Sequence, residues 1–273
     1  MFYEPHIDRV ELLCPRLPAA FDGLTILHLS DLHITRWTRR LTLWQAALHL
    51  LRPDLLIVTG DLGHRAWLWK TSLPHLARLL DAIPTTLGTY FILGNHDSLK
   101  LGSALAHDGR RYLRNESVIL ERPGSEKAGP RLALIGIDQH RRIDTDIPTA
   151  MHAVHASDFK LMVLHYPDLI YPAAAAGADV CLAGHTHGAQ ICWPDGQPII
   201  RHDSLPQEQC TGVHKIAGTW MVVNRGIGVA GLRMRLFCPP HVILLTLRRT
   251  HADPESPTMH RSSRQVITAA AKP

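Results

Sequence analysis

The chain has 273 residues, of which 45% are hydrophobic and 19% charged, values typical of a globular protein with a sizeable core. This composition excludes collagenous, coiled-coil and low-complexity chains. Its 29 Lys and Arg residues exceed its 24 Asp and Glu residues, and the net charge of +5 favours anionic partners without identifying one.

Short apolar segments alternate between strand-like and helix-like patterns, which indicates the α/β class with two sheets covered by helices. No internal repeat or linker interrupts this pattern, so a single domain over 1–249 is expected, followed by an aperiodic and disordered tail over 250–273. Helices are predicted at 41–51, about 72–83, 99–107 and 169–176. Strands are predicted at 24–30, 54–60, 89–93, 131–137, 159–164 and 179–183, and short strands and turns fill the segment to about 249, including 219–224 and 242–247.

Cysteine usage and hydropathy favour a cytoplasmic protein. The five cysteines are odd in number and form no C-x-x-C pair, so neither a disulfide framework nor a zinc ribbon is indicated. No apolar run approaches the ~20 residues of a membrane span. The first 30 residues carry Glu, Asp and Pro where a signal peptide has an apolar stretch.

Polar clusters follow directly on five of the predicted strands. In open α/β sheets, ligands bind outside the carboxyl ends of strands, so clusters from separate strands can converge on one site. Their oxygen and imidazole donors suit Zn, Mn, Fe or Mg rather than thiolate chemistry. The clusters are Asp31 with His33, Asp61, Asn95 with His96 and Asp97, His165, and His185 with His187.

Each cluster taken alone has a simpler structural explanation. An Asp-x-His after a strand is more often a helix cap or a solvated turn, and the Gly-containing clusters are compatible with tight turns. A single histidine such as His165 is usually a hydrogen-bonded core residue. Five such clusters, all after buried strands and all built from metal donors, are improbable as coincident turns. Their conjunction predicts a metal site.

The clusters, in this order, resemble the D-x-H, G-D, G-N-H-D, H and G-H-x-H motifs of the calcineurin-like metallophosphoesterases, over residues 24–249. The resemblance implies a four-layer αββα sandwich with two divalent metals at the strand ends. The chain is most similar to the branch with YkuE-like phosphoesterases and the chlamydial-type UDP-2,3-diacylglucosamine pyrophosphatases. The matching segments are 30–33, 165–168, 184–188 with Gln190, 224–228 and 244–247.

The resemblance also implies a role for each motif residue. Asp31, His33 and His187 would hold one metal, Asn95, His165 and His185 the other, and Asp61 would bridge both. Two divalent ions lower the pKa of a bridging water, so that hydroxide attacks the phosphoryl group near neutral pH. Mn, Fe and Zn all suit these ligands.

His96 is expected to face the scissile phosphate and act as the catalytic acid. Many members of the family carry an Asp three positions after the bridging one, and it orients this histidine. This chain has His64 at that position, so the orienting carboxylate is missing and Asp97 is a candidate substitute. Asp97 and Arg225 are further candidates for substrate binding, and a solvated loop arginine is the alternative for Arg225.

The expected substrate is a phosphoester, and the branch resemblance suggests UDP-2,3-diacylglucosamine, a lipid-linked nucleotide. Trp37, Trp44, Trp67 and Trp69 lie in two segments that also carry Arg, His and Lys, which suits an acyl chain or a peripheral contact with the inner membrane face. Core packing explains them equally well. A generic soluble phosphodiesterase or phosphatase and a non-catalytic binding scaffold stay open as alternatives, whereas no nucleic-acid partner is expected.

Overall fold

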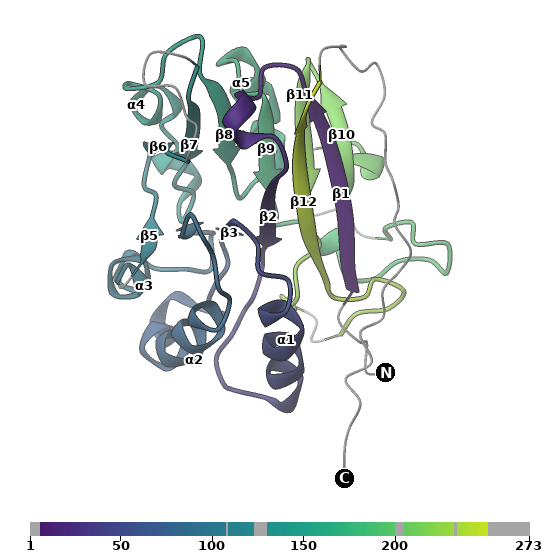
Figure 1. The fold of residues 1–273 in the computed structure, drawn as a ribbon. Helices are drawn as coiled ribbons and strands as arrows, with labels where there is room; N and C mark the ends of the chain where they lie inside the picture. Colours follow the sequence, from purple (N-terminus) through teal and green to yellow (C-terminus); the bar gives the residue numbers. More distant parts are fainter. Residues whose placement is uncertain (1–5, 108, 123–129, 200–204, 232–233, 251–273) are drawn as a thin grey trace.

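The computed structural model describes residues 6–107, 109–122, 130–199, 205–231 and 234–250. Two six-stranded sheets face each other, and helices cover their outer sides (Figure 1). The fold is therefore of the α/β class, with the four layers of the αββα sandwich that the resemblance implies.

The first sheet has the strand order β1-β12-β2-β3-β4-β5 and is mixed, because β12 runs antiparallel to β2 whereas the other neighbours are parallel. Helices α1, α2 and α3 cover its outer side. The strands are β1 His6–Cys14, β2 Leu24–Leu29, β3 Leu55–Thr59, β4 Thr89–Ile92, β5 Arg110–Tyr112 and β12 His241–Arg249, and the helices are α1 Arg39–His49, α2 Trp69–Asp81 and α3 Leu99–Leu105.

The second sheet has the strand order β10-β11-β9-β8-β7-β6, in which β11, β9, β8 and β7 are parallel and the two outermost pairs are antiparallel. Helices α4 and α5 cover its outer side. The strands are β6 Glu116–Leu120, β7 Leu132–Gly136, β8 Phe159–Val163, β9 Val180–Ala183, β10 Gly212–Ile216 and β11 Thr219–Val223, and the helices are α4 Ile147–Ala150 and α5 Ile170–Ala175.

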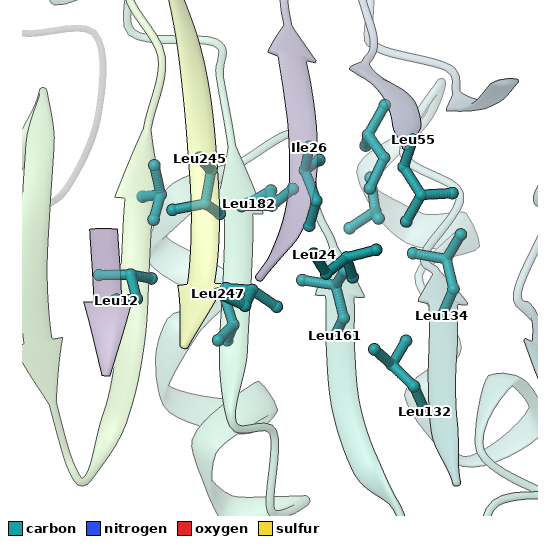
Figure 2. Packing of buried hydrophobic residues seen from close by; sticks show 14 of the residues in the cluster. Leu12, Leu24, Ile26, Leu55, Leu132, Leu134, Leu161, Leu182, Leu245 and Leu247 are labelled. Atoms are coloured by element: carbon teal, nitrogen blue, oxygen red, sulfur yellow. The ribbon is translucent and has the colours of Figure 1, made fainter. Parts of the chain in front are cut away.

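Three apolar clusters separate the four layers. The central cluster contains leucines and isoleucines from the inner faces of both sheets, such as Ile26 of β2 and Leu161 of β8 (Figure 2). A second cluster joins the first sheet to α1–α3 around the fully buried Trp44, and a third joins the second sheet to α4 and α5. Since strands β3, β7, β8 and β9 are buried on both faces, their sequences are continuous apolar runs rather than alternating ones.

Over the described residues, the structure has an element for every predicted helix and strand, and it adds three strands and an α-helix outside the predicted ranges: β1, β5, β6 and α4. Strands β5 and β6 are short or half-exposed, and α4 has four residues. Their sequences therefore show neither the alternation of a strand nor the apolar period of a helix. The predicted tail lies outside the described residues apart from Thr250. The single-domain organisation of 1–249 stays a prediction.

Candidate metal centre

The loops after five strands meet at one edge of the sandwich. Strands β2, β3 and β4 of the first sheet lead into the loops of Asp31, Asp61 and Asn95, and strands β8 and β9 of the second lead into those of His165 and His185. Backbone hydrogen bonds join the loops: Asp31 N donates to Gly60 O at 3.0 Å, and Gly184 N donates to His165 O at 3.1 Å. The predicted convergence of the five clusters is present in the fold.

One group of four side chains converges within 4.8 Å and consists of Asp31, His33, Asp61 and His187. His33 Nε2 lies 3.1 Å from His187 Nε2 and 3.5 Å from Asp61 Oδ2, and His187 Nε2 lies 3.4 Å from Asp31 Oδ1. Asp31 Oδ1 is buried and has no hydrogen-bond partner. Ligand atoms about 2.0–2.1 Å from a tetrahedral ion would lie about 3.3 Å apart, so this donor set fits a divalent metal.

A second group forms around His165. The ring donates from Nδ1 to the carbonyl of Thr59 at 2.8 Å, because a carbonyl oxygen can only accept. Burial lowers the pKa of His165, so the ring is neutral and Nε2 carries no proton. That nitrogen lies 3.1 Å from Asn95 Oδ1 and 3.6 Å from Asp61 Oδ1, which are both acceptors. Three acceptors facing one another without a proton fit a cation between them.

The remaining predicted ligand, His185, lies beside this second group. Its ring is packed edge-on against the rings of His165 and Tyr166, with centroids 5.0 and 4.4 Å away. Its backbone N–H donates to Asp31 Oδ2 at 3.0 Å, which links it to the first group.

The loops that carry these side chains adopt unusual backbone conformations. Of the eleven described non-glycine residues with positive φ, five are Asp31, His33, Asp61, His185 and His187. Each such residue costs of order 1 kcal/mol, so their concentration here marks a functional site. The loops also approach closely at Gly94, where a Cβ atom would lie 2.3 Å from Asp61 Oδ1. Glycine is therefore required between the two groups.

Burial raises the pKa of both buried carboxyl groups of the centre, Asp31 and Asp61, and at Asp31 the neighbouring Asp61 charge adds to the rise. Two carboxylates held this close without a cation repel each other and lose hydration. A bound divalent ion would compensate both effects, which agrees with the fit of the donor set.

His96 is half-buried beside the centre and is oriented by the backbone. Its Nδ1 lies 2.9 Å from the carbonyl oxygen of His64 and donates to it. Its backbone N–H donates to Asp61 Oδ1 at 2.9 Å, and its ring meets that of His33 edge-on at 4.9 Å. The orienting group that seemed to be missing is thus the main chain of residue 64, and Nε2 is directed away from it.

The contacts of Asp97 do not support the expectation that it binds substrate or orients His96. It is 4% exposed, and its carboxylate accepts hydrogen bonds from the backbone N–H groups of Leu62, Gly63 and Gly94, at 2.8 to 3.1 Å. These bonds join the loop after β3 to the loop after β4. Asp97 is therefore a structural residue, and the sequence could not separate this role from a catalytic one.

Arg225 lies in the loop after β11, which borders the metal centre. Its side chain crosses the turn of His185 and His187, since a Cβ atom on Gly188 would lie 2.6 Å from Arg225 Cγ. The Nε atom is buried without a hydrogen-bond partner, and Nη2 has Asp8 Oδ2 4.0 Å away. The Nε donor thus lies unpaired beside the centre, and a role of Arg225 in substrate binding stays a prediction.

Two supporting groups were absent from the sequence predictions. Gln139, which follows β7, accepts hydrogen bonds from the backbone N–H groups of His165 and Tyr166, and Ser30 Oγ donates to Asp31 Oδ2 at 2.5 Å. Ser30 adjoins a predicted ligand, which is a usable signal. Gln139 had none, because its contact arises only when β7 and β8 pair.

Comparison with known proteins assigns the site to a family. The model of the calcineurin-like phosphoesterase family matches residues 24–189, which contain all seven predicted metal ligands and His96. The chain belongs to the calcineurin-like phosphoesterase family. Relatives named as metallophosphoesterases match it over most of their length, so the protein is a metallophosphoesterase with a candidate metal-binding cluster.

Two relatives cover nearly the whole chain. The Bacillus subtilis metallophosphoesterase YkuE is 27% identical over 262 residues, which span 92% of this chain and 89% of that protein. UDP-2,3-diacylglucosamine pyrophosphatase LpxG of Chlamydia trachomatis is 25% identical and spans 89% of this chain and 90% of that protein. Among solved structures, Vps29 of Entamoeba histolytica complexed with zinc aligns with a TM-score of 0.37 and 11% identity, over 78% of this chain and 81% of that one.

A further relative, a transmembrane protein with a metallophosphoesterase domain from Bos taurus, is 26% identical over 89% of this chain and 57% of its own length. In the described part of this chain, every helix is too short or too polar to cross a bilayer.

Proposed function

We propose that this metallophosphoesterase hydrolyses a phosphoester or pyrophosphate bond at a dinuclear centre. The observation that carries the proposal is the placement of Asp61, whose Oδ2 lies 3.5 Å from His33 Nε2 and whose Oδ1 lies 3.6 Å from His165 Nε2. A carboxylate that presents one oxygen to each of two donor groups is positioned to bridge two ions. Asp31, His33 and His187 would complete one group, and Asn95, His165 and His185 the other.

When bound, two divalent ions of Mn, Zn or Fe would supply the charge that activates water and binds phosphoryl oxygens. The chain's own residues then orient the substrate. His96, held through Nδ1 by the carbonyl of His64, can donate a proton from Nε2 to the leaving oxygen when its ring is in the doubly protonated imidazolium form. Arg225 contributes donors for a second phosphate or a phosphate oxygen.

The test uses the full-length protein reconstituted with Mn²⁺ and compared with the Asp61→Asn, His96→Asn and His152→Asn variants. We expect about two metal equivalents in the wild-type protein, measured by elemental analysis, and a loss of metal in Asp61→Asn. His96→Asn should keep its metals while kcat on bis-p-nitrophenyl phosphate falls roughly 10²- to 10⁴-fold. His152 is an exposed histidine away from the centre, so His152→Asn is the matched control. This variant should leave the metal content and kcat unchanged.

Full turnover by metal-loaded His96→Asn would exclude His96 as the acid. A wild-type protein that binds no metal and hydrolyses nothing after Mn²⁺ addition would instead support the binding-scaffold alternative.

For the substrate, we propose a lipid-linked nucleotide pyrophosphate of the UDP-2,3-diacylglucosamine type, cleaved to UMP and the lipid phosphate. The support is the relative LpxG, which carries this substrate in its name and matches over 90% of its length. The measurement compares kcat/KM for this lipid with that for soluble phosphodiesters. Hydrolysis of bis-p-nitrophenyl phosphate alone, without lipid turnover, would favour the generic soluble phosphodiesterase.

A further inference from the structure

The helices that cover the first sheet carry a single acidic residue, Asp81 at the end of α2, and it pairs with Arg110 of β5. Apart from Asp81, these helices lie in residues 32–53, 62–80 and 98–107, which have no Asp or Glu but eight Lys and Arg residues. Subtracting these eight charges from the net +5 of the chain leaves −3 for the remainder. The positive charge of the protein is therefore concentrated on one layer, which we call the cationic face. Its basic residues are Arg36, Arg39, Arg40, Arg52, Arg65, Lys70, Arg78 and Lys100.

All eight cations are exposed, and within the described chain none of them is paired with a carboxylate. Several arginines elsewhere are paired, such as Arg16 with Asp179 and Arg131 with Asp158. On the cationic face, three cations lie over tryptophan rings instead. The Arg65, Lys70 and Arg78 charges are 5.0, 5.6 and 3.9 Å from the rings of Trp67, Trp69 and Trp37. Their charges are thus available to an external anionic partner.

Large apolar side chains are exposed on the same face. The outward side of α1 carries Leu43, 45% exposed, and Leu50, seven positions later, is 68% exposed. Trp67, just before α2, is 70% exposed. Because α1 buries Leu41, Trp44 and Leu48 against the sheet, these exposed leucines lie on its opposite side, among exposed polar residues such as Arg39 and Arg40. An outer side of leucine and tryptophan among arginines is unfavourable in water and suits the boundary between headgroups and acyl chains.

The cationic face adjoins the metal centre at two places. The guanidinium of Arg40, in the first turn of α1, donates to the carbonyl of Ile227 in the loop next to Asp31. Trp67 lies three residues after His64, whose carbonyl orients His96. Trp67, Trp69 and Lys70 line an open hollow together with Leu99, Lys100 and Ala104 of α3. The helices α1, α2 and α3 lie together beside the lower ends of the strands in Figure 1.

We propose that the cationic face is a peripheral membrane-docking surface for an anionic bilayer. Unpaired basic residues supply the attraction to anionic headgroups, and Leu43, Leu50 and Trp67 enter the interface. Nucleic acid would also be attracted by this positive charge, but its phosphate backbone makes no favourable contact with exposed aliphatic side chains such as Leu43 and Leu50. This docking does not depend on which phosphoester is cleaved, since binding to vesicles is measured without hydrolysis.

The test is cosedimentation of the full-length protein with large unilamellar vesicles of phosphatidylcholine, with and without about 40% phosphatidylglycerol. We expect binding to the anionic vesicles that weakens as salt is raised, and little binding to pure phosphatidylcholine. Leu50→Gln and Trp67→Ala should each weaken the affinity roughly fivefold. The double variant Lys70→Glu with Lys100→Glu should weaken it at least about 30-fold.

Matched controls come from the rest of the surface. Ile143 is 88% exposed, Trp193 is 58% exposed, and Arg9 is an exposed cation of β1. Ile143→Gln, Trp193→Ala and Arg9→Glu should bind anionic vesicles within about twofold of the wild-type protein. Equal and weak wild-type binding to both vesicle types would overturn the proposal, and so would equal losses in the face and control variants. Binding to duplex DNA that displaces the vesicles and is insensitive to Leu50→Gln would assign the face to nucleic acid instead.

Discussion

A backbone carbonyl orients the imidazole that we place opposite the leaving oxygen. Side-chain substitution at residue 64 cannot remove the hydrogen bond from His96 Nδ1, because the acceptor is the main-chain oxygen. The His64 ring itself lies nearly parallel to that of His96, with centroids 6.3 Å apart, and meets His33 edge-on at 5.6 Å. The orientation of His96 therefore does not depend on which side chain residue 64 carries.

His64→Ala should therefore retain kcat for bis-p-nitrophenyl phosphate within about tenfold of the wild-type value, whereas His96→Ala loses roughly 10² or more. Steady-state kinetics of both variants, at matched metal content, measures the difference. A metal-loaded His64→Ala enzyme as slow as His96→Ala would contradict orientation by the carbonyl and assign the chemistry to the His64 ring.

Residue types in the sequence were sufficient to predict which side chains gather at the centre, but not what each one contacts. Asp97 illustrates the limit: its neighbours Leu62 and Gly63 belong to another loop, and their N–H groups reach its carboxylate only after β3 and β4 pair. The left-handed backbone of Asp31 and His187 is equally invisible to residue patterns, since non-glycine residues rarely adopt it.

At the scale of elements, strands with local periodicity were predictable and strands defined by their neighbours were not. Strand β1 carries Asp8, Arg9 and Glu11, and its pairing along the whole length of β12 makes it a strand at the sheet edge. Its partner begins more than 220 residues later, at His241. Tertiary pairing therefore outweighs the weak local propensity of the β1 sequence.

A buried arginine joins two elements of the site. Arg235 is 8% exposed and donates to the carbonyl oxygens of His187, at 3.1 Å, Arg225, at 2.7 Å, and Gly228, at 2.8 Å. It thus ties the turn after β9 to the loop after β11. Without the guanidinium, several buried carbonyl groups would have no donor.

Arg235→Gln should consequently lower the free energy of unfolding by about 2–4 kcal/mol, because glutamine is shorter and supplies two N–H donors instead of five. Urea denaturation of the metal-free protein measures this loss. Arg9→Gln, on the exposed side of β1, is the control and should change stability by less than about 0.5 kcal/mol. Equal stability of Arg235→Gln and wild type would show that the two loops are held together by other contacts.

For the whole molecule, alternation of apolar runs predicted two sheets with helical covers, and strand-end clusters predicted the edge at which the site lies. The distribution of charge between layers follows from the topology, which places three acid-free segments on the outer side of one sheet. Carboxylates of the rest of the chain pair with arginines within the fold, as Asp158 does with Arg131. Such pairs make stability depend on pH.

Asp158 accepts hydrogen bonds from Arg131 Nη2, at 2.7 Å, and from the backbone N–H of His155, at 2.8 Å. Burial alone would raise the pKa of Asp158, but these partners lower it from 3.8 to about 2. Since the pKa in the folded protein lies below that of the unfolded chain, the carboxylate stabilises the fold fully above about pH 4. This contribution is lost as the pH falls toward 2.

The expected loss is about 1–2 kcal/mol, because the Arg131 side chain is 30% exposed and solvent weakens the pair. Urea denaturation of the wild type and Asp158→Asn at pH 5, 4, 3 and 2 measures it. The stability difference between the two proteins should be largest at pH 5 and shrink by most of this amount at pH 2, where the wild-type carboxyl group is protonated in the unfolded chain and about half protonated in the folded one. A difference that stays constant over this range would show that Asp158 contributes by its shape and not by its charge.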